Sequence, residues 1–172
     1  MSANITTLNA DEARAASGEL AEVLFDCVDG GASVGFVNPF SRADAAAFFD
    51  GVARDMAEGR TILLAARVEG RIVGTVQLGI ALPPNQPHRA DVKKLLVHRR
   101  ARNQGIAAAL MTKLESVARA HGRTLLVLDT VKEGTADRLY QRLGWQRTGV
   151  IPDYALFPDG RFCDTVVFWK RV

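Results

Sequence analysis

The expected order of strands and helices constrains the fold of this chain more than any other feature. Two β-rich runs, 61–68 and 72–80, are separated by Glu69-Gly70-Arg71, a short turn that predicts an antiparallel hairpin. After the hairpin, strand and helix patterns alternate: a strand at 91–97, a helix at 104–121, a strand at 124–128, a helix at 135–143, and strands at 145–150 and 163–170. Strands joined through a helix are usually parallel. We therefore expect an α/β (α+β) fold with a mixed, mostly antiparallel sheet, a central parallel strand pair, and helices on both faces.

The N-terminal part adds one strand and two helices to this plan. A strand is expected at 5–8, followed by a helix over 11–28 that stops at Gly30-Gly31. A second helix follows the cap-like Ser41, after an apolar loop at 30–40. No linker or repeat divides the 172 residues, so we expect a single domain over 1–172.

Composition excludes several classes of protein. Hydrophobic residues make up 48% and charged residues 24%, which is typical of globular chains and atypical of disordered ones. The net charge of +3 is too small to name a partner by itself. Cys27 and Cys163 have no neighbouring ligand residues, so we expect buried thiols and no disulfide, and the scattered histidines predict no metal site. Without a signal peptide or an apolar run of membrane-spanning length, we expect a cytoplasmic protein with no membrane partner.

The stretch VKKLLVHRRARNQGIAAAL, at 92–110, predicts an anion-binding turn. A strand runs into a basic, glycine-containing turn that opens a helix, whose first N–H groups have no intrahelical acceptor. Gly105 permits close backbone approach, and Arg99, Arg100 and Arg102 would add mobile positive charge. The alternative is an ordinary strand-helix connection with solvated arginines. Neither GxxxxGK[ST] nor GxGxxG occurs here, which disfavours nucleoside triphosphates and dinucleotides.

The remaining pattern, Arg102-x-x-Gly105-x-Ala107, resembles the (Q/R)xxGx(G/A) loop of the GNAT N-acetyltransferases. The later run TADRLYQRLGW, at 135–145, is similar to the tyrosine-containing helix that follows in those enzymes. Segments outside these motifs, including NQPHRADVKKLLV, LVLDT and YALFPDGRFCDTVVFWK, resemble the tabtoxin-resistance type of GNAT acetyltransferase. The resemblance implies a GNAT fold and acetyl-CoA as the cosubstrate.

The resemblance also implies roles for individual residues. Tyr140 would protonate the departing thiolate, while Asp129 and Asp91 would bind or deprotonate the acceptor amine. Ser33, Val34 and Phe36 would line the acceptor pocket. The cofactor residues are those at the end of the strand, which would line the acetyl-pantetheine arm, and those of the turn, which would hold the pyrophosphate: Leu96, Val97, His98, Arg102, Asn103, Gln104, Gly105, Ile106 and Ala107.

Structural interpretations stand beside these roles. Asp91 can pair with Arg89, Asp129 followed by Thr130 can fix a turn, and Tyr140 can be a core-edge tyrosine. The sequence also departs from the family pattern, because Asp91 stands where the branch has a glutamate.

The sequence thus predicts an acetyl-CoA-dependent N-acetyltransferase that transfers acetyl directly, in a ternary complex, to the amine of a small amino-acid-like molecule such as a toxin or antibiotic. The alternatives are a protein or peptide N-acetyltransferase, a non-catalytic CoA-binding module, and a nucleic-acid-binding module built on the basic cluster around 89–102. Strand alternation argues against nucleic acid, because Lys93 and Lys94 are expected on opposite faces of the sheet. The sequence is compatible with both a monomer and a homodimer.

Overall fold

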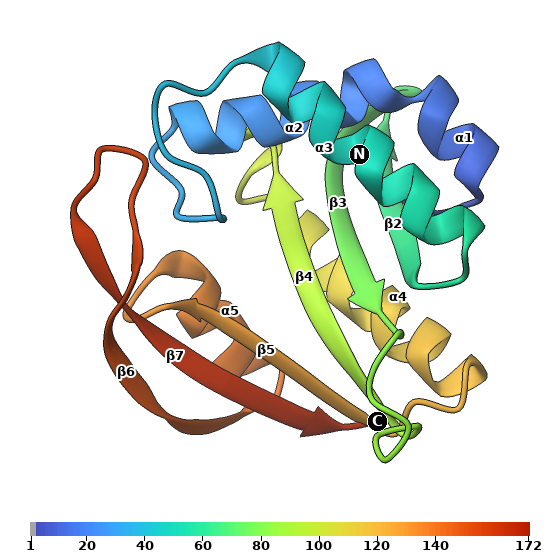
Figure 1. The fold of residues 1–172 in the computed structure, drawn as a ribbon, viewed down its shortest axis with the longest axis vertical. Helices are drawn as coiled ribbons and strands as arrows, with labels where there is room; N and C mark the ends of the chain where they lie inside the picture. The colour runs from blue at the N-terminus through green and yellow to red at the C-terminus, as the bar shows by residue number, and fades with distance from the viewer. Residues whose placement is uncertain (1–2) are drawn as a thin grey trace.

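A computed structural model describes residues 3–172 of the protein. Its centre is one seven-stranded sheet in the order β1-β2-β3-β4-β5-β7-β6. The strands are β1 (Asn4–Leu8), β2 (Thr61–Val68), β3 (Arg71–Gly79), β4 (Arg89–Val97), β5 (Leu125–Val131), β6 (Gln146–Leu156) and β7 (Phe162–Arg171). β4 and β5 are parallel, and every other neighbouring pair is antiparallel. The expected mixed sheet with a parallel pair is therefore confirmed (Figure 1).

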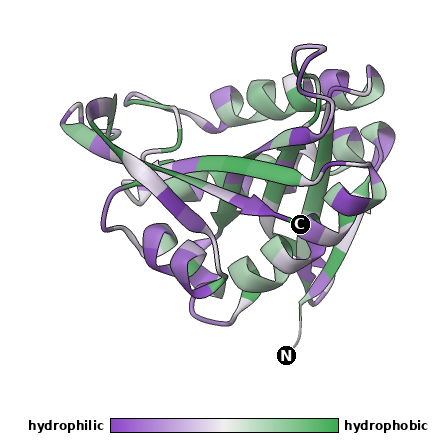
Figure 2. Cartoon of the chain, turned by 90° about the horizontal axis from the view of Figure 1, so that it is seen from below, coloured by the Kyte–Doolittle hydropathy of each residue, from purple (hydrophilic) through white to green (hydrophobic). Residues whose placement is uncertain are grey.

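The helices cover both faces of the sheet, as predicted. They are α1 (Ala10–Ala15), α2 (Ser17–Asp29), α3 (Arg42–Ala57), α4 (Ile106–Ala120) and α5 (Thr135–Arg142). One core cluster joins α1, α2 and α3 to one side of the sheet, and a second joins α4 and α5 to the other. Figure 2 shows the hydrophobic strands lying between helices whose outer sides are hydrophilic. No helix within residues 3–172 is long and apolar enough to cross a membrane.

Two differences from the sequence-based prediction concern element boundaries, and a third concerns the order of the strands. The helix expected at 11–28 is two helices, because Ala16 ends α1 and caps the start of α2. β5 continues to Val131, so Asp129 lies inside a strand and not in a turn. β7 lies between β5 and β6, so the strand that follows α5 does not touch β5. The Ser41 cap is confirmed, since its hydroxyl accepts from the Asp44 N–H at 3.1 Å.

Candidate active site

The most open feature of the sheet is the gap between its two parallel strands. Arg89, Ala90 and Asp91 of β4 pair with β5 at Leu125–Val127, and no pairing follows. The two strands then diverge towards the C-terminal end of β4 (Figure 1). Beyond Asp91 and Val127, the backbone N–H and carbonyl groups on the facing edges of β4 and β5 are not paired with each other. Such an edge can bind an extended molecule by hydrogen bonds.

A β-bulge in β4 changes which side chains face the opening. Lys94 has a φ of 50°, and the register with β3 shifts between Thr75 and Gln77. Because the bulge adds a residue to one strand, Lys93 and Lys94 both lie on the α3 side of the sheet. The expectation that these lysines face opposite sides is therefore wrong.

Asp129 lies on the same side of the sheet as the two lysines. Its neighbours Leu126 and Leu128 pack into the core beneath α4 and α5, so alternation turns Asp129 to the opposite face. Its carboxylate is exposed and accepts a hydrogen bond from the Thr165 hydroxyl at 3.3 Å. Asp129 also acts electrostatically on both Lys94 and Tyr140. It therefore lies where the two faces of the site meet.

Tyr140 lies on the other face of the sheet, the one covered by α4 and α5. It is 5% exposed in the core beneath α4 and α5, with its ring centroid 5.8 Å from those of Trp145 and Phe168. This confirms that the ring points at the sheet. No hydrogen bond of its hydroxyl is found within residues 3–172. Burial, reinforced by the charge of Asp129, raises the pKa of Tyr140 well above its usual value, so the phenol stays protonated at neutral pH.

The turn after β4 ends in a row of free donors. Gly105, with a φ of 76°, is the N-cap of α4, and the first intrahelical bond there runs from the Ala109 N–H to the Gly105 carbonyl. The N–H groups of Ile106, Ala107 and Ala108 precede that bond and have no acceptor within residues 3–172. A Cβ atom on Gly105 would meet nothing within 4 Å, so the space in front of these donors is open. The turn fits an anionic group such as a phosphate.

Two arginines of the turn are held in place, contrary to the expectation of mobile positive charge. Asp26 accepts from the Arg99 backbone N–H at 2.7 Å and from its Nε at 2.9 Å, and Asp29 accepts from Nη2 at 2.6 Å. The Arg102 Nε donates to the Val97 carbonyl at 3.1 Å. Within residues 3–172, neither Arg100 nor Arg102 forms an ion pair, so both bring uncompensated positive charge to the turn.

Asp26 should contribute to stability through this clamp. Burial works to raise the pKa of Asp26, but the hydrogen bonds from Arg99 outweigh it and the net pKa is lowered. The stabilisation is therefore present above the unfolded-state pKa of about 4 and is lost as pH falls through the lower folded-state value. We expect Asp26→Ala to lower the free energy of unfolding by about 2 kcal/mol at pH 7. This loss is smaller than for a fully buried ion pair, because Arg99 is half exposed and solvent screens its charge. Urea denaturation of both proteins at pH 7 and pH 3 measures this, and an undiminished difference at pH 3 would contradict it.

The strand end before the turn is partly engaged in structure. Leu96 is buried and pairs with Thr75 of β3. The Val97 carbonyl, besides its bond to Arg102, lies 3.6 Å from the Cys27 thiol. The His98 ring accepts from the Arg100 N–H and lies 3.5 Å from Asp26. The His98 side chain thus organises the turn. Cys27 and Cys163 are both buried and free, as expected.

Asp91 occupies the closed end of the opening. It is the last β4 residue paired with β5, and its carboxylate forms an ion pair with Arg89. Asp129 lies two residues beyond the Asp91 partner, on the same face. The Asp91 carboxylate is therefore engaged by Arg89. Within the described residues, the Asp129 carboxylate contacts only solvent and the Thr165 hydroxyl, which also lies within hydrogen-bond distance of the Thr130 carbonyl.

The loop between α2 and α3 is fastened across the far side of the opening. The Ser33 hydroxyl donates to the Leu156 carbonyl at 2.6 Å, and the Asn38 N–H donates to the Pro158 carbonyl at 2.9 Å. Val34 and Phe36 pack against the core of this layer. The Lys94 ammonium lies 5.8 Å from the centroid of the Phe36 ring. The loop thus brings Phe36 to the site, while Ser33 holds the loop to the β6–β7 hairpin.

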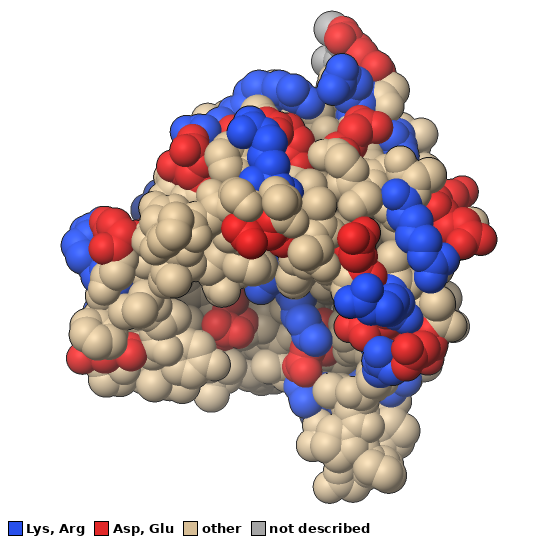
Figure 3. All heavy atoms as spheres, turned by 45° about the horizontal axis from the view of Figure 1, so that its top comes forward, with Lys and Arg blue, Asp and Glu red and all other residues tan. Residues whose placement is uncertain are grey.

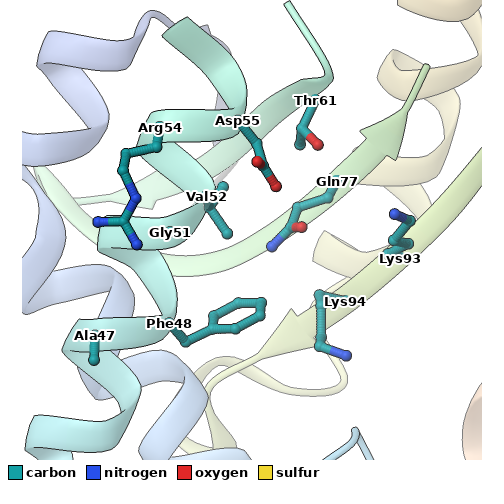
Figure 4. A pocket seen from close by; sticks show the side chains of 10 residues that line it. All are labelled: Ala47, Phe48, Gly51, Val52, Arg54, Asp55, Thr61, Gln77, Lys93 and Lys94. Atoms are coloured by element: carbon teal, nitrogen blue, oxygen red, sulfur yellow. The ribbon is translucent and has the colours of Figure 1, made fainter. Parts of the chain in front are cut away.

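Sequence reasoning missed the contribution of Lys94 and Gln77. Both line a cleft of about 430 Å³ between α3 and the β3–β4 strands (Figure 4). Figure 3 shows that one side of the molecule is hollowed and that acidic and basic atoms lie together in the hollow. The available signal was a polar residue in an otherwise apolar run, Gln77 within Ile72–Leu78. No cluster of metal-ligating side chains is present in the part of the chain described.

A family model supplies the decisive comparison. Residues 24–145 match the model of the acetyltransferase (GNAT) family, and this region includes the β4–β5 opening, the turn and Tyr140. The chain belongs to the GNAT family. Human N-acetyltransferase 8B is 39% identical to this GNAT protein over 89 residues, covering 49% of the chain and 38% of that relative. The chain thus spans less than two fifths of the length of the curated relatives it matches.

Solved structures share the fold of this GNAT protein. A phosphinothricin acetyltransferase from Sinorhizobium meliloti, solved in complex with acetyl-CoA, is 19% identical with a TM-score of 0.78, covering 100% of this chain and 89% of that one. A ribosomal-protein-alanine N-acetyltransferase from Brucella melitensis is 20% identical with a TM-score of 0.80, covering 98% and 99%. Since one name gives a small acceptor and the other a protein acceptor, fold similarity alone does not select the acceptor.

Proposed function

We propose that this GNAT protein transfers the acetyl group of acetyl-CoA to the amine of a small amino-acid-like molecule. The observation that carries the proposal is the arrangement of the opening between β4 and β5. Asp129 lies on its α3 face, Tyr140 lies on its α4–α5 face, and the anion-binding turn lies at its end. A thioester held in the opening would meet a base from one side and an acid from the other.

The cosubstrate would be held mainly by backbone groups. Asn103, Gln104 and Gly105, with the first residues of α4, would present N–H groups to the pyrophosphate, and Arg100 and Arg102 would add charge. The unpaired edges of β4 and β5 would bind the amides of the pantetheine arm. Leu96, Val97 and His98 would position that arm through the backbone. The acetyl-CoA in the S. meliloti relative supports this choice of cosubstrate.

The transfer removes two protons from the acceptor ammonium and supplies one proton to the leaving sulfur. Asp129, directly or through a water, would take the first proton, and the freed nitrogen would attack the thioester carbonyl. The nitrogen of the tetrahedral intermediate is then positively charged and loses its second proton as the C–S bond breaks. Tyr140 would donate its own proton to the sulfur and be reprotonated by that second proton, while Asp129 releases the first proton to solvent. Protonation of Asp129 removes the charge that helps to raise the pKa of Tyr140, so the first step makes Tyr140 a stronger acid for the second. No covalent enzyme intermediate is required.

Asp91 remains a second candidate for binding the amine. Its ion pair with Arg89 would have to be shared or broken for this role. We therefore assign the proton transfer to Asp129 and leave Asp91 to orient the acceptor.

A small acceptor is favoured over a protein by the fastened α2–α3 loop. The bonds from Ser33 and Asn38 to the β6–β7 hairpin narrow the approach on the acceptor side. An extended peptide needs an open groove. The likeness to a phosphinothricin acetyltransferase and the resemblance to the tabtoxin-resistance type support an amino-acid-like toxin or antibiotic as the acceptor class.

The nucleic-acid alternative loses its basis in the structure. Arg89 pairs with Asp91, and Arg99 pairs with two aspartates, so much of the basic cluster is neutralised. Lys93 and Lys94 line the cleft beneath α3. The test of the proposed function is release of free CoA thiol with a panel of amines and peptides. Activity confined to peptides would overturn the small-acceptor assignment, and binding without turnover would favour a CoA-binding module.

Asp129→Asn gives a direct test of the base. We expect kcat/KM for the acceptor to fall about tenfold to thirtyfold at pH 7, because the amide cannot take the proton. The loss should shrink at high pH, where more of the acceptor amine is already neutral. Initial rates across pH 7–10 measure this. A loss that stays constant across the range would show that Asp129 only binds or supports the site.

A further inference from the structure

The cleft beneath α3 contains a polar group that the fold leaves unsatisfied. Gln77 is 4% exposed, and its side-chain nitrogen has no hydrogen-bond partner within residues 3–172. Figure 4 shows its side chain extending between α3 and Lys94 of β4. Buried donors are nearly always paired, so one aimed into a cleft indicates a missing acceptor.

The charges around the cleft favour an anion as that acceptor. Lys93 and Lys94 border the same cleft from β4, and neither forms an ion pair or side-chain hydrogen bond within residues 3–172. Asp55 of α3 also borders it, but Arg60 donates to its carboxylate at 2.6 Å. The cleft therefore combines unpaired cations with an unpaired amide donor, while its acidic residue is already neutralised.

Lys94 is held where it can reach both the cleft and the opening. Its ammonium lies 5.7 Å from the Phe48 ring centroid and 5.8 Å from that of Phe36, so two aromatic faces fix it. Gly35 leaves room for it, because a Cβ there would lie 3.2 Å from the Lys94 Nζ. Burial lowers the pKa of Lys94, the charge of Asp129 acts against that shift, and the charge of Lys93 adds to it. An anion bound in the cleft would stabilise the positive charge of Lys94.

We propose that this cleft binds the carboxylate of the acceptor, with Lys94 as the residue that selects acceptors carrying a carboxylate and Gln77 and Lys93 as supporting donors. The inference rests on the proposed function, since it places the acceptor amine at Asp129 on the same face of the sheet. A zwitterionic amino acid then meets opposite charges at its two ends. The subsite deepens the proposed function, because it assigns the residues that would distinguish an amino-acid-like acceptor from an amine without a carboxylate.

The experiment compares acceptors that differ only in the carboxylate. Unbranched ω-amino acids of increasing chain length and the n-alkylamines of matching length are assayed by release of CoA thiol, together with the L-amino acids and their decarboxylated amines. We expect the wild-type protein to prefer the carboxylated member at one chain length. Lys94→Met should raise KM for that acceptor about tenfold or more, with little change for the matching alkylamine that lacks the carboxylate or for acetyl-CoA.

Matched variants separate this role from a general loss of structure. Lys113→Met removes an exposed lysine of α4 and should change nothing. Gln77→Glu places a like charge against the carboxylate and should weaken binding of the acceptor that carries a carboxylate more than binding of the matching alkylamine. If Lys94→Met does not fold, Gln77→Glu and Lys93→Met carry the test.

The outcomes also separate failure of the subsite from failure of the proposed function. Equal activity of the wild-type protein on acceptors with and without the carboxylate overturns the carboxylate subsite while transfer to small amines stands. The same holds if Lys94→Met lowers both activities alike. Binding of acetyl-CoA without transfer to any small amine overturns the proposed function and the subsite together.

Discussion

Replacing Gly105 with valine is expected to weaken acetyl-CoA binding by about 100-fold. Gly105 has a φ of 76°, in the left-handed region that a β-branched residue strongly resists. The free variant should relax to another backbone conformation and lose the row of N–H donors at the start of α4. Restoring the turn on binding would cost about 1–3 kcal/mol, and lost hydrogen bonds add to this. Titration calorimetry with acetyl-CoA measures the change in Kd.

Gly122→Val is the matched control for Gly105→Val. Gly122 has a φ of 68° just beyond the other end of α4, and a Cβ there also meets nothing within 4 Å. The two variants impose similar backbone strain, so both should lose stability, but only Gly105→Val should lose affinity for acetyl-CoA. Normal binding by Gly105→Val would mean that the pyrophosphate does not lie at this turn.

The sequence predicted those parts of the molecule that depend on neighbouring residues. Two β-rich runs joined by a short turn identified the hairpin, the Ser41 cap marked the start of α3, and the turn before α4 could be recognised from its glycine. The position of β7 could not be found in this way. Its place between β5 and β6 depends on long-range pairing, such as Asp129 with Val167, and local periodicity does not encode this.

The site was predicted less completely than the fold for the same reason. Arg99 was expected to be mobile, because its partner Asp26 lies 73 residues away in the sequence. Lys93 and Lys94 were expected on opposite faces, because the bulge at Lys94 leaves no mark in the alternation of residue types. The pairing of Asp91 with Arg89, two residues apart, was foreseen. Local chemistry was therefore predictable, and the convergence of distant side chains was not.

Tyr140→Phe is expected to lower kcat about 100-fold and to leave the affinity for acetyl-CoA nearly unchanged. Phenylalanine keeps the ring that packs against Trp145 and Phe168, so the fold and the opening should persist. Only the proton donor is lost. Because burial raises the pKa of Tyr140, wild-type kcat should not fall as pH passes the usual tyrosine value of about 10. Steady-state rates and calorimetry on both proteins measure the two effects.

The other tyrosine of the chain separates this chemical role from a change in packing. Tyr154 on β6 is 54% exposed, and Tyr154→Phe should alter neither kcat nor affinity. Thermal unfolding of Tyr140→Phe should match the wild-type protein, since the hydroxyl has no hydrogen bond within residues 3–172 that the substitution removes. Equal losses in turnover and acetyl-CoA affinity would contradict the acid role, because an interaction made only as the C–S bond breaks cannot contribute to binding beforehand.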